Sequence, residues 1–324
     1  MTVRLILSIV VSFALVYMFT PRMIPYMKKF NFGQIVREEG PETHKTKSGT
    51  PTMGGVAIIC GIILSYLLLV EKNIDSIVYI LSIIGFGLVG FIDDYIKVVK
   101  KRNLGLRAYQ KLIGQFIFAF LLTFYQYRFG ALRDGIYIPL LNQTINLGWF
   151  YLPFAFVVVV GIVNSVNLTD GLDGLAAGVT IIYLSSYFII LLVLKDFLVI
   201  DQIYFLLIGV LIGALGAFLC YNWFPAKIFM GDVGSLAIGG AVASLSILTG
   251  TFIIFPVVGL VYFAETISVV LQVAYYKRTG RRIFLMSPLH HHYEQKGLKE
   301  IQVVKGFLKA SMACGLVAVI LVLI

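Results

Sequence analysis

The stretch QIYFLLIGVLIGALGAFLCY, residues 202–221, contains no charged side chain and is almost wholly apolar. About 20 such residues in a helix are enough to cross the hydrocarbon core of a bilayer, and a helix satisfies its backbone hydrogen bonds internally. The stretch also lacks the alternation of apolar and polar side chains that is typical of a half-buried strand. It therefore predicts a transmembrane helix and an all-α integral membrane protein.

The rest of the chain repeats this pattern. Apolar residues make up 59% of the sequence and charged residues 13%, whereas about 25% of the residues in soluble domains are charged. The ninth apolar stretch contains Glu265 and Gln272, so we expect it to bend or to face protein. We expect one polytopic membrane domain over residues 1–324 with about ten transmembrane helices, at residues 3–22, 53–70, 76–96, 109–127, 150–166, 175–194, 202–221, 234–249, 252–276 and 304–324.

The distribution of Lys and Arg predicts the orientation of these spans. Twenty of the 26 basic residues lie in or beside the loops after the first, third, seventh and ninth spans, and the opposite loops carry only Lys72, Arg128, Arg133 and Lys195. Because basic loops face the cytoplasm, we expect both termini outside. The net charge of +10 then marks this face and anionic partners, and we expect no nucleic acid.

Two further segments bear on the fold. The first span is followed by Thr20–Met23 and not by a small-residue cleavage site, which favours a retained helix over a signal peptide. On the outer side, Gly135–Gly148 contains two short stretches of strand-forming residues on either side of Asn142. This pattern predicts a small outer β-hairpin, with Pro139 keeping it at an edge.

Five Asp residues lie where expected spans meet cytoplasmic loops, although the chain has only 16 acidic residues in all. Carboxylates at the boundary of a bilayer are poorly solvated unless they hold a metal, a proton or a substrate. With the basic loops beside them, they indicate a metal-dependent enzyme that brings a charged soluble substrate to a lipid. These residues are Asp93, Asp94, Asp170, Asp173 and Asp232.

Asp93 and Asp94 end the third expected span. Neighbours on a helix point about 100° apart, so we expect one carboxylate to face the reacting centre and the other a cation or backbone group. The alternative is a solvated pair, or one paired with Lys97. A helix C-terminus disfavours negative charge, which weakens that alternative.

Two loops combine carboxylates with glycine. The segment Asn164–Gly174 offers side-chain oxygens and free N–H groups to a nucleotide or metal, and it lacks the spacing of an EF-hand. The segment Asn222–Ser235 places an aromatic, one cation and Asp232 together. The alternatives are a polar turn with an Asp that caps the next helix, and Phe229 dipping into the membrane interface.

Two other segments could bind anions. Three adjacent histidines, His290–His292, diverge too much to share one metal, so a surface for phosphate or sugar is favoured. Residues 45–55 place two Lys beside hydroxyls and Gly but lack the P-loop pattern. The alternative for this second segment is a positively charged anchor followed by a turn.

Five segments, in this order, resemble the bacterial phospho-N-acetylmuramoyl-pentapeptide transferases, and the resemblance covers nearly the whole chain. Asp93-Asp94 and the Gly-Asp segment resemble the wider polyprenyl-phosphate sugar-1-phosphate transferase superfamily. The triple His and the Thr-Pro-Thr-Met-Gly-Gly segment resemble the muramoyl branch. The five segments are GTPTMGG (49–55), FIDDY (91–95), NSVNLTDGLDG (164–174), FMGDVGS (229–235) and PLHHHYE (288–294).

The resemblance implies a reaction and its partners. UDP-N-acetylmuramoyl-pentapeptide and undecaprenyl phosphate would give the first lipid-linked peptidoglycan precursor and UMP, with Mg²⁺ as cofactor. The site would face the cytoplasm in a bacterial cytoplasmic (inner) membrane, with the lipid bilayer as a partner and a homodimer as one assembly considered. Direct attack and an aspartyl-phosphate intermediate both stay open.

The resemblance also implies residue roles. Asp232 and Asn167 would hold the metal, and Asp93 or Asp94 would deprotonate or align the lipid phosphate. Phe229 would stack on uracil. The catalytic set is Asp93, Asp94, Asp232 and His290. The substrate-binding set is Lys47, Thr52, Asn164, Asn167, Asp170, Gly171, Leu172, Asp173, Asn222, Phe229, Gly231, Gln272, His291 and His292.

Two rival functions can be separated from this one. The N-acetylglucosamine-1-phosphate branch of the same superfamily differs at the triple His. An ion-coupled transporter or channel should carry Asp residues near the centres of its spans and show repeated halves. Here the Asp residues lie at span ends, which favours the enzyme.

Overall fold

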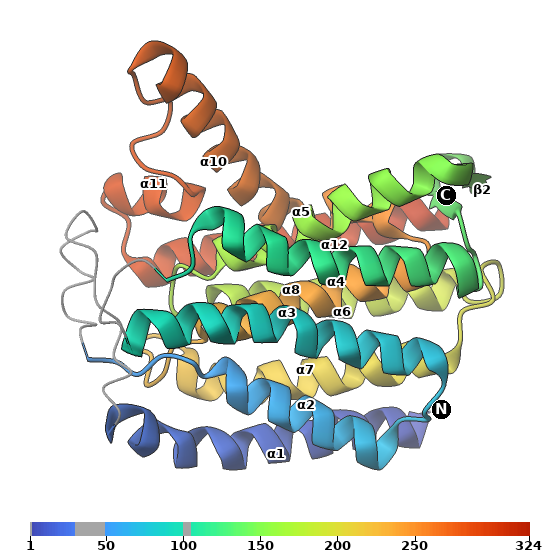
Figure 1. The fold of residues 1–324 in the computed structure, drawn as a ribbon, viewed down its shortest axis with the longest axis horizontal. Coiled ribbons are helices and arrows are strands. Elements are labelled where there is room, and N and C mark those ends of the chain that lie inside the picture. Colours follow the sequence, from blue (N-terminus) through green and yellow to red (C-terminus); the bar gives the residue numbers. More distant parts are fainter. Residues whose placement is uncertain (1, 30–48, 100–104) are drawn as a thin grey trace.

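The computed structural model describes residues 2–29, 49–99 and 105–324, and it is almost entirely helical (Figure 1). The expected all-α class is confirmed. The helices that build the bundle are α1 (Thr2–Lys29), α2 (Gly55–Leu69), α3 (Ile74–Val99), α4 (Ala108–Phe129), α5 (Tyr151–Thr169), α6 (Leu175–Leu194), α7 (Gln202–Asn222), α8 (Gly231–Leu248), α9 (Phe255–Val258), α10 (Leu260–Thr279) and α12 (Glu300–Leu323). A further short helix, α11 (Leu289–Gln295), precedes α12.

Length and composition support fewer crossings than the ten expected. Seven helices in the described part of the chain are long and apolar enough to cross a membrane, namely α1, α3, α5, α6, α7, α8 and α12. The pair α9 and α10 raises this to eight, although the two are bent by 84°. Helix α2 is apolar but short, and α4 is not among the seven. Ten crossings and the side on which the termini lie therefore stay predictions.

The bend between α9 and α10 confirms what was expected of the ninth span. Glu265 is fully buried and Gln272 is 9% exposed, so both polar side chains face protein. Beyond the bend, α10 leans away from the bundle and carries the chain towards α11 (Figure 1). Both side chains have partners in the segment that follows α10: Glu265 lies beside His290, and Gln272 bonds to Ile283 and Phe284.

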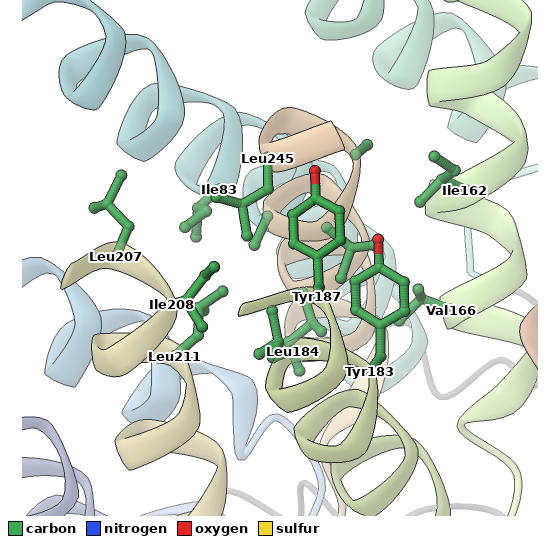
Figure 2. Close-up of a cluster of buried hydrophobic side chains, with 14 of the residues drawn as sticks. Ile83, Ile162, Val166, Tyr183, Leu184, Tyr187, Leu207, Ile208, Leu211 and Leu245 are labelled. Carbon is green, nitrogen blue, oxygen red and sulfur yellow. The ribbon is translucent and has the colours of Figure 1, made fainter. Parts of the chain in front are cut away.

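Helix α8 lies at the centre of the bundle. Every residue from Val233 to Leu248 is buried, and the helix packs against α2, α3 and α5. Apolar side chains of the neighbouring helices close around it, including Ile83 of α3, Ile162 of α5 and Tyr183 of α6 (Figure 2). A helix that is apolar on all faces is typical of a buried position. The packing holds the first turn of α8 in one place.

The expected β-hairpin is confirmed, and its place on the outer side stays a prediction. Strands β1 (Gly135–Ile138) and β2 (Gln143–Asn146) pair antiparallel, with Gly135 opposite Asn146. Pro139 does not lie on a strand edge, because it begins the short 3₁₀ turn Pro139–Leu141 that links the strands. The first helix begins and the last helix ends at the same end of the bundle as this hairpin (Figure 1).

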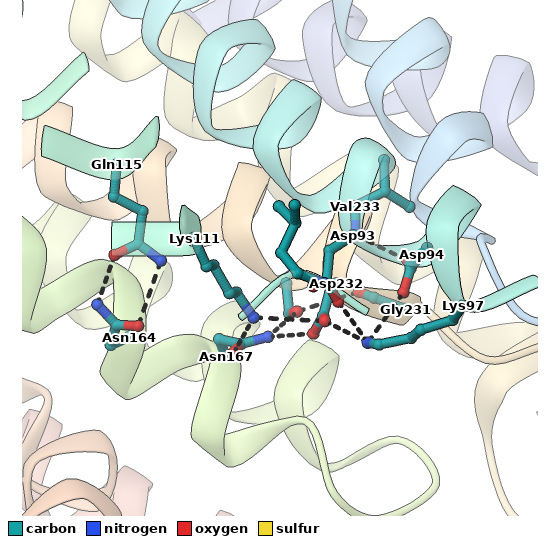
Figure 3. Close-up of polar contacts among 12 residues, drawn as sticks. Asp93, Asp94, Lys97, Lys111, Gln115, Asn164, Asn167, Gly231, Asp232 and Val233 are labelled. Carbon is teal, nitrogen blue, oxygen red and sulfur yellow. Dashed lines mark hydrogen bonds and ion pairs between the residues drawn. The ribbon is translucent and has the colours of Figure 1, made fainter. Parts of the chain in front are cut away.

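The opposite end of the bundle is where the predicted site residues gather. Helix α3 ends there, α4 begins, α5 ends and α8 begins (Figures 1 and 3). Four helix ends thus converge from three separate parts of the chain. This convergence brings polar residues together at the edge of an otherwise apolar bundle.

Candidate active site

Three carboxylates form the centre of the site (Figure 3). Asp93 and Asp94 come from the last turns of α3, and Asp232 is the second residue of α8. One oxygen of each lies within 4.8 Å of the other two. Asp93 and Asp94 are 3% and 4% exposed, so these charges are drawn out of water and must be compensated.

Asp93 and Asp94 are adjacent on α3 but hold different backbone groups. Asp94 Oδ2 accepts a hydrogen bond from the N–H of Val233 at 3.0 Å. Asp93 Oδ1 accepts one from the N–H of Leu106 at 2.7 Å. The first bond ties α3 to the start of α8, and the second ties it to the segment that leads into α4. Each carboxylate keeps a second oxygen for the centre.

Two glycines allow α3 and α8 to come this close. A Cβ atom on Gly90 would lie 2.1 Å from the backbone oxygen of Asp232. Gly231 has a φ of +74°, which side chains rarely adopt, and a Cβ there would lie 2.5 Å from Asp94 Oδ2. Any larger residue at either position would push Asp232 away from its partners.

Two lysines compensate the carboxylates. Lys97 Nζ lies 2.5 Å from Asp93 Oδ2, 2.6 Å from Asp232 Oδ2 and 3.5 Å from Asp94 Oδ1. Lys111 Nζ lies 3.3 Å from Asp232 Oδ2. Two ammonium groups against three carboxylates leave one negative charge uncompensated within this cluster. The cluster therefore favours a further cation.

Asn167, at the end of α5, joins the carboxylates to the lysines. Its Nδ2 donates to Asp232 Oδ1 at 2.7 Å and to Ser235 Oγ at 2.8 Å, while its Oδ1 accepts from Lys111 at 3.0 Å. A metal bound by both Asn167 and Asp232 would need the amide oxygen turned towards Asp232. A half-turn of the amide group exchanges its two atoms and meets this need.

These residues fit Mg²⁺. The cluster offers carboxylate and amide oxygens only, which are the hard ligands that Mg²⁺ prefers. It also carries the unbalanced negative charge described above. The ammonium group of Lys97 now contacts all three carboxylates, so a bound ion would displace it towards an anionic substrate.

The loop between α5 and α6 lies beside the cluster and is braced from several sides. Asp173 Oδ2 accepts from the N–H of Ala226 at 2.9 Å, and its own N–H donates to Glu300 of α12 at 2.8 Å. Asn222 Oδ1 accepts from the N–H of Gly174 at 3.0 Å, while its Nδ2 donates to Ile228 O. These bonds join the two loops that were expected to hold the nucleotide.

Asp170 is the most perturbed carboxyl group in this loop. Burial, with the nearby charges of Asp232 and Asp94, raises its pKa to about 8. The group is thus largely protonated at neutral pH and can donate a hydrogen bond, as a carboxylate cannot. Gly171 and Leu172 follow it, the second of them buried.

The segment before α2 is joined to the segment before α8 by backbone hydrogen bonds. The N–H of Phe229 donates to Pro51 O at 2.8 Å, and that of Gly54 donates to Phe229 O at 2.9 Å. Thr52 therefore lies beside Gly231, where a Cβ on the glycine would lie 3.0 Å from its hydroxyl. The ring of Phe229 is half-buried at this junction. Lys47 lies outside the described residues.

The three histidines have different surroundings on α11. His290 is buried, and its Nδ1 lies 3.1 Å from Glu265 Oε2 of α10. His291 Nδ1 lies 2.8 Å from Glu294 Oε2. His292 Nδ1 accepts from the N–H of Leu285, and burial with Lys296 nearby lowers the pKa of His292, so its imidazole is neutral at pH 7.

Two predicted substrate-binding residues are occupied elsewhere. Gln272 Oε1 accepts from the N–H groups of Ile283 and Phe284, so it fixes the loop between α10 and α11. Asn164 lies one turn before Asn167 and exchanges hydrogen bonds with Gln115 of α4. Within the described residues, neither side chain forms a hydrogen bond with the carboxylate cluster.

The chain is similar to known proteins over most of its length. Residues 76–250 match the sequence model of glycosyl transferase family 4, and residues 47–59 match signature 1 of the phospho-N-acetylmuramoyl-pentapeptide-transferases. Curated proteins named phospho-N-acetylmuramoyl-pentapeptide-transferase are similar over almost their whole length. One from Desulfitobacterium hafniense is 45% identical over 98% of this chain and 97% of its own. One from Heliobacterium modesticaldum is 46% identical over 98% of each chain, and one from Thermoanaerobacter sp. strain X514 is 47% identical over 94% of each.

The chain belongs to the phospho-N-acetylmuramoyl-pentapeptide-transferase family.

The family matches cover different parts of the site. The phospho-N-acetylmuramoyl-pentapeptide-transferase signature covers the segment that pairs with Phe229. The broader family 4 match includes Asp93, Asp94 and Asp232 but stops before α10 and the three histidines. This division runs parallel to the resemblance, in which Asp93-Asp94 and the Gly-Asp segment resemble the wider superfamily and the three histidines the muramoyl branch.

Four residues of the site were not in the predicted set. Lys97 appeared only as a partner in the alternative to a functional Asp pair, although its position four residues after Asp93 was a usable signal. Lys111 and Ser235 carry no such local signal, because their partners are distant in sequence. Glu265 was expected to face protein, but its pairing with His290 depends on the bend between α9 and α10.

Proposed function

We propose that the protein transfers phospho-N-acetylmuramoyl-pentapeptide from its UDP-linked donor to undecaprenyl phosphate, releasing UMP. The observation that carries this proposal is the convergence of Asp93, Asp94 and Asp232 within 4.8 Å, matched by two lysines. Transfer between two anions needs positioning and neutralisation of charge more than covalent chemistry from the protein. This cluster supplies both at the edge of an apolar bundle.

The lysines bind phosphate in this mechanism. Lys97 and Lys111 exchange part of their contacts with Asp232 for oxygens of the donor diphosphate. Bound Mg²⁺, held by Asp232 and Asn167, would neutralise charge on the diphosphate. Asp94 keeps its bond to the N–H of Val233 and so holds the first turn of α8 in place.

The acceptor is prepared by a carboxylate. Asp93 Oδ2, released from Lys97, takes the proton of the lipid phosphate or aligns that phosphate for attack. An oxygen of the lipid phosphate then attacks the phosphorus that is attached to the sugar. The bond between that phosphorus and the bridging oxygen breaks, and the bridging oxygen leaves with UMP.

The loops on the other side of the cluster hold the nucleotide. Phe229 stacks on uracil, beside Gly171, Leu172 and the backbone near Asp173. The protonated carboxyl of Asp170 donates a hydrogen bond to the substrate. His291 and His292 line the sugar side.

We also propose ten membrane crossings, with both termini and the hairpin outside and the carboxylate cluster facing the cytoplasm of a bacterial inner membrane. The basic loops at the cluster end support this orientation. In a variant without its native cysteines, Asn142→Cys should react with an impermeant thiol reagent from outside, and Lys296→Cys should not. The reverse pattern would overturn the orientation. A homodimer is part of the proposal and is tested by native mass spectrometry.

The function is tested with purified protein, undecaprenyl phosphate, Mg²⁺ and each of two donors, with UMP and the lipid product measured. UDP-N-acetylmuramoyl-pentapeptide should release UMP and give a lipid-linked product, and chelation of Mg²⁺ should stop the reaction. UDP-N-acetylglucosamine should give no product. Turnover of the second donor alone would assign the chain to the rival activity.

A further inference from the structure

A pair of side-chain amides joins α4 to α5 beside the carboxylate cluster (Figure 3). Asn164 Nδ2 donates to Gln115 Oε1 at 2.7 Å, and Gln115 Nε2 donates to Asn164 Oδ1 at 3.3 Å. Gln115 is fully buried and its amide faces Asn164, so it does not reach a substrate. Any part that Gln115 has in the reaction must therefore pass through other residues.

The pair lies one helical turn from two members of the site. Gln115 follows Lys111 by four residues on α4, and Asn164 precedes Asn167 by three residues on α5. Residues three or four apart lie on the same face of a helix, one above the other. The amide pair and the bond from Lys111 Nζ to Asn167 Oδ1, at 3.0 Å, are therefore successive contacts between the same two helices.

Packing alone fixes the position of α4 less well than that of α8. The first turns of α4 expose Leu112, Ile113, Phe116 and Ile117, so this helix packs on one side only, whereas α8 is buried from Val233 to Leu248. Apolar contacts are not directional, so they tolerate small shifts of one helix along another. Hydrogen bonds between two amides do not, because they weaken steeply with distance and angle. The amide pair therefore sets the register of α4 against α5.

We infer that Gln115 and Asn164 are positioning residues for the transfer reaction, which hold the start of α4 in register with the end of α5 so that Lys111 reaches the donor diphosphate. This inference rests on the proposed function. Lys111 contacts both Asp232 and Asn167, and it exchanges part of these contacts for phosphate oxygens when the donor binds. While the lysine changes partners, the amide pair keeps the backbone from which it extends in place.

The test compares the binding of UDP and of uridine, which differ only in the diphosphate. Gln115→Met keeps the length of the side chain but removes the amide. It should weaken UDP binding by about tenfold, in the lower part of what one hydrogen bond to a charged group contributes, and leave uridine binding unchanged. In a Lys111→Met background, Gln115→Met should cost nothing further, because a residue that acts through another has no effect once that residue is gone. An equal loss in both backgrounds, or for both ligands, overturns the inference.

Tyr125→Phe is the matched control. Tyr125 also bonds α4 to another helix, but at the far end, where its hydroxyl donates to Asp75 of α3 at 2.6 Å. Loss of this bond should leave UDP binding and turnover as in wild type. An effect as large as that of Gln115→Met would assign the amide pair to helix packing and overturn the inference.

A swapped pair tests the same geometry with both amides present, and it serves if Gln115→Met does not fold. Gln115→Asn shortens one side chain and should weaken UDP binding, whereas adding Asn164→Gln restores the combined length of the two side chains and should recover most of the loss. A Gln115→Asn variant without a loss, or a swapped pair that recovers nothing, overturns the inference. Ligand-observed NMR in detergent measures these affinities without turnover. A wild-type protein that releases no UMP from the donor refutes the proposed function, whereas the UDP and uridine affinities still test the amide pair.

Discussion

The bundle contains two buried polar clusters with opposite character. At one end, three carboxylates share two lysines, and one negative charge is left over. Between α6 and α8, a hydroxyl cluster is neutral and closed: Tyr187 pairs with Thr249 and Thr251, and these two threonines pair with each other at 2.9 Å. The comparison distinguishes a polar cluster that can bind a ligand from one that only stabilises helix packing. The carboxylate cluster has a negative charge that its own lysines do not compensate, whereas the hydroxyl groups of the second cluster all bond to one another.

The largest expected effect is at the charged cluster. Asp232→Asn should lower turnover by about a thousandfold or more, as when one electrostatic contact to a transition state is removed. The protein should stay folded, because the change removes a charge from a cluster with excess negative charge. UMP release and thermal melting in detergent measure the two properties.

Asp201→Asn is the matched control. Asp201 caps α7 by accepting from the N–H of Ile203, and Asn caps a helix equally well. This variant should keep wild-type turnover and melting temperature. An Asp232→Asn protein with normal rate and normal Mg²⁺ dependence would remove Asp232 from the metal site.

The next effect separates rate from binding within the charged cluster. Asp93→Asn keeps an acceptor for the N–H of Leu106 but loses the base, so kcat should fall by about a hundredfold. The affinity for the UDP-linked substrate should change far less. If binding collapses while the bound substrate reacts at the normal rate, Asp93 is a binding residue and the base lies elsewhere. Asp94→Asn, measured in the same way, shows which carboxylate has the larger effect on rate.

How much of this could be predicted from the sequence depends on the range over which each interaction acts. The helices follow from local apolar stretches, and the expectation that the ninth would bend or face protein follows from Glu265 and Gln272, although the break itself lies at Gly259. The number of crossings does not follow from the sequence, because α2 is short and α4 is too polar to count among the seven helices that could cross a membrane. Asp93, Asp94 and Asp232 could be proposed because each is conspicuous in its own segment.

The partners of these residues could not be predicted, since they depend on how helices meet. Lys111 reaches Asp232 only because α4 begins beside the first turn of α8. Asn222 was expected to line the nucleotide cleft, yet both atoms of its amide join two loops. A sequence identifies chemically conspicuous groups, but it does not say which of their atoms are already in use.

A smaller effect is expected at the loop that borders the charged cluster. A base stacked on an aromatic ring contributes roughly 1–3 kcal/mol in single-strand binders, so Phe229→Ala should weaken UMP binding by about tenfold to a hundredfold. Phe229→Trp should be mild. Phe224→Ala changes an exposed aromatic of the same loop and should leave affinity unchanged. Unchanged affinity in Phe229→Ala, with a lowered melting temperature, would instead assign Phe229 to membrane anchoring.

The smallest effect is expected in the neutral cluster, and it tests the other side of the comparison. Tyr187→Phe removes one hydroxyl, but Thr249 and Thr251 stay paired with each other, and Thr249 still donates to Leu245 O. Hydrogen bonds between membrane helices contribute about 0.6 kcal/mol on average, so unfolding free energy should fall by about that amount. Turnover per folded molecule should not change, because a closed neutral network has no charge or free donor to offer a substrate. Denaturation in mixed micelles and UMP release from the folded fraction measure both quantities. A loss of turnover at normal stability would mean that the hydroxyl cluster is coupled to the site, and closure of a polar network would then no longer separate packing from function in this bundle.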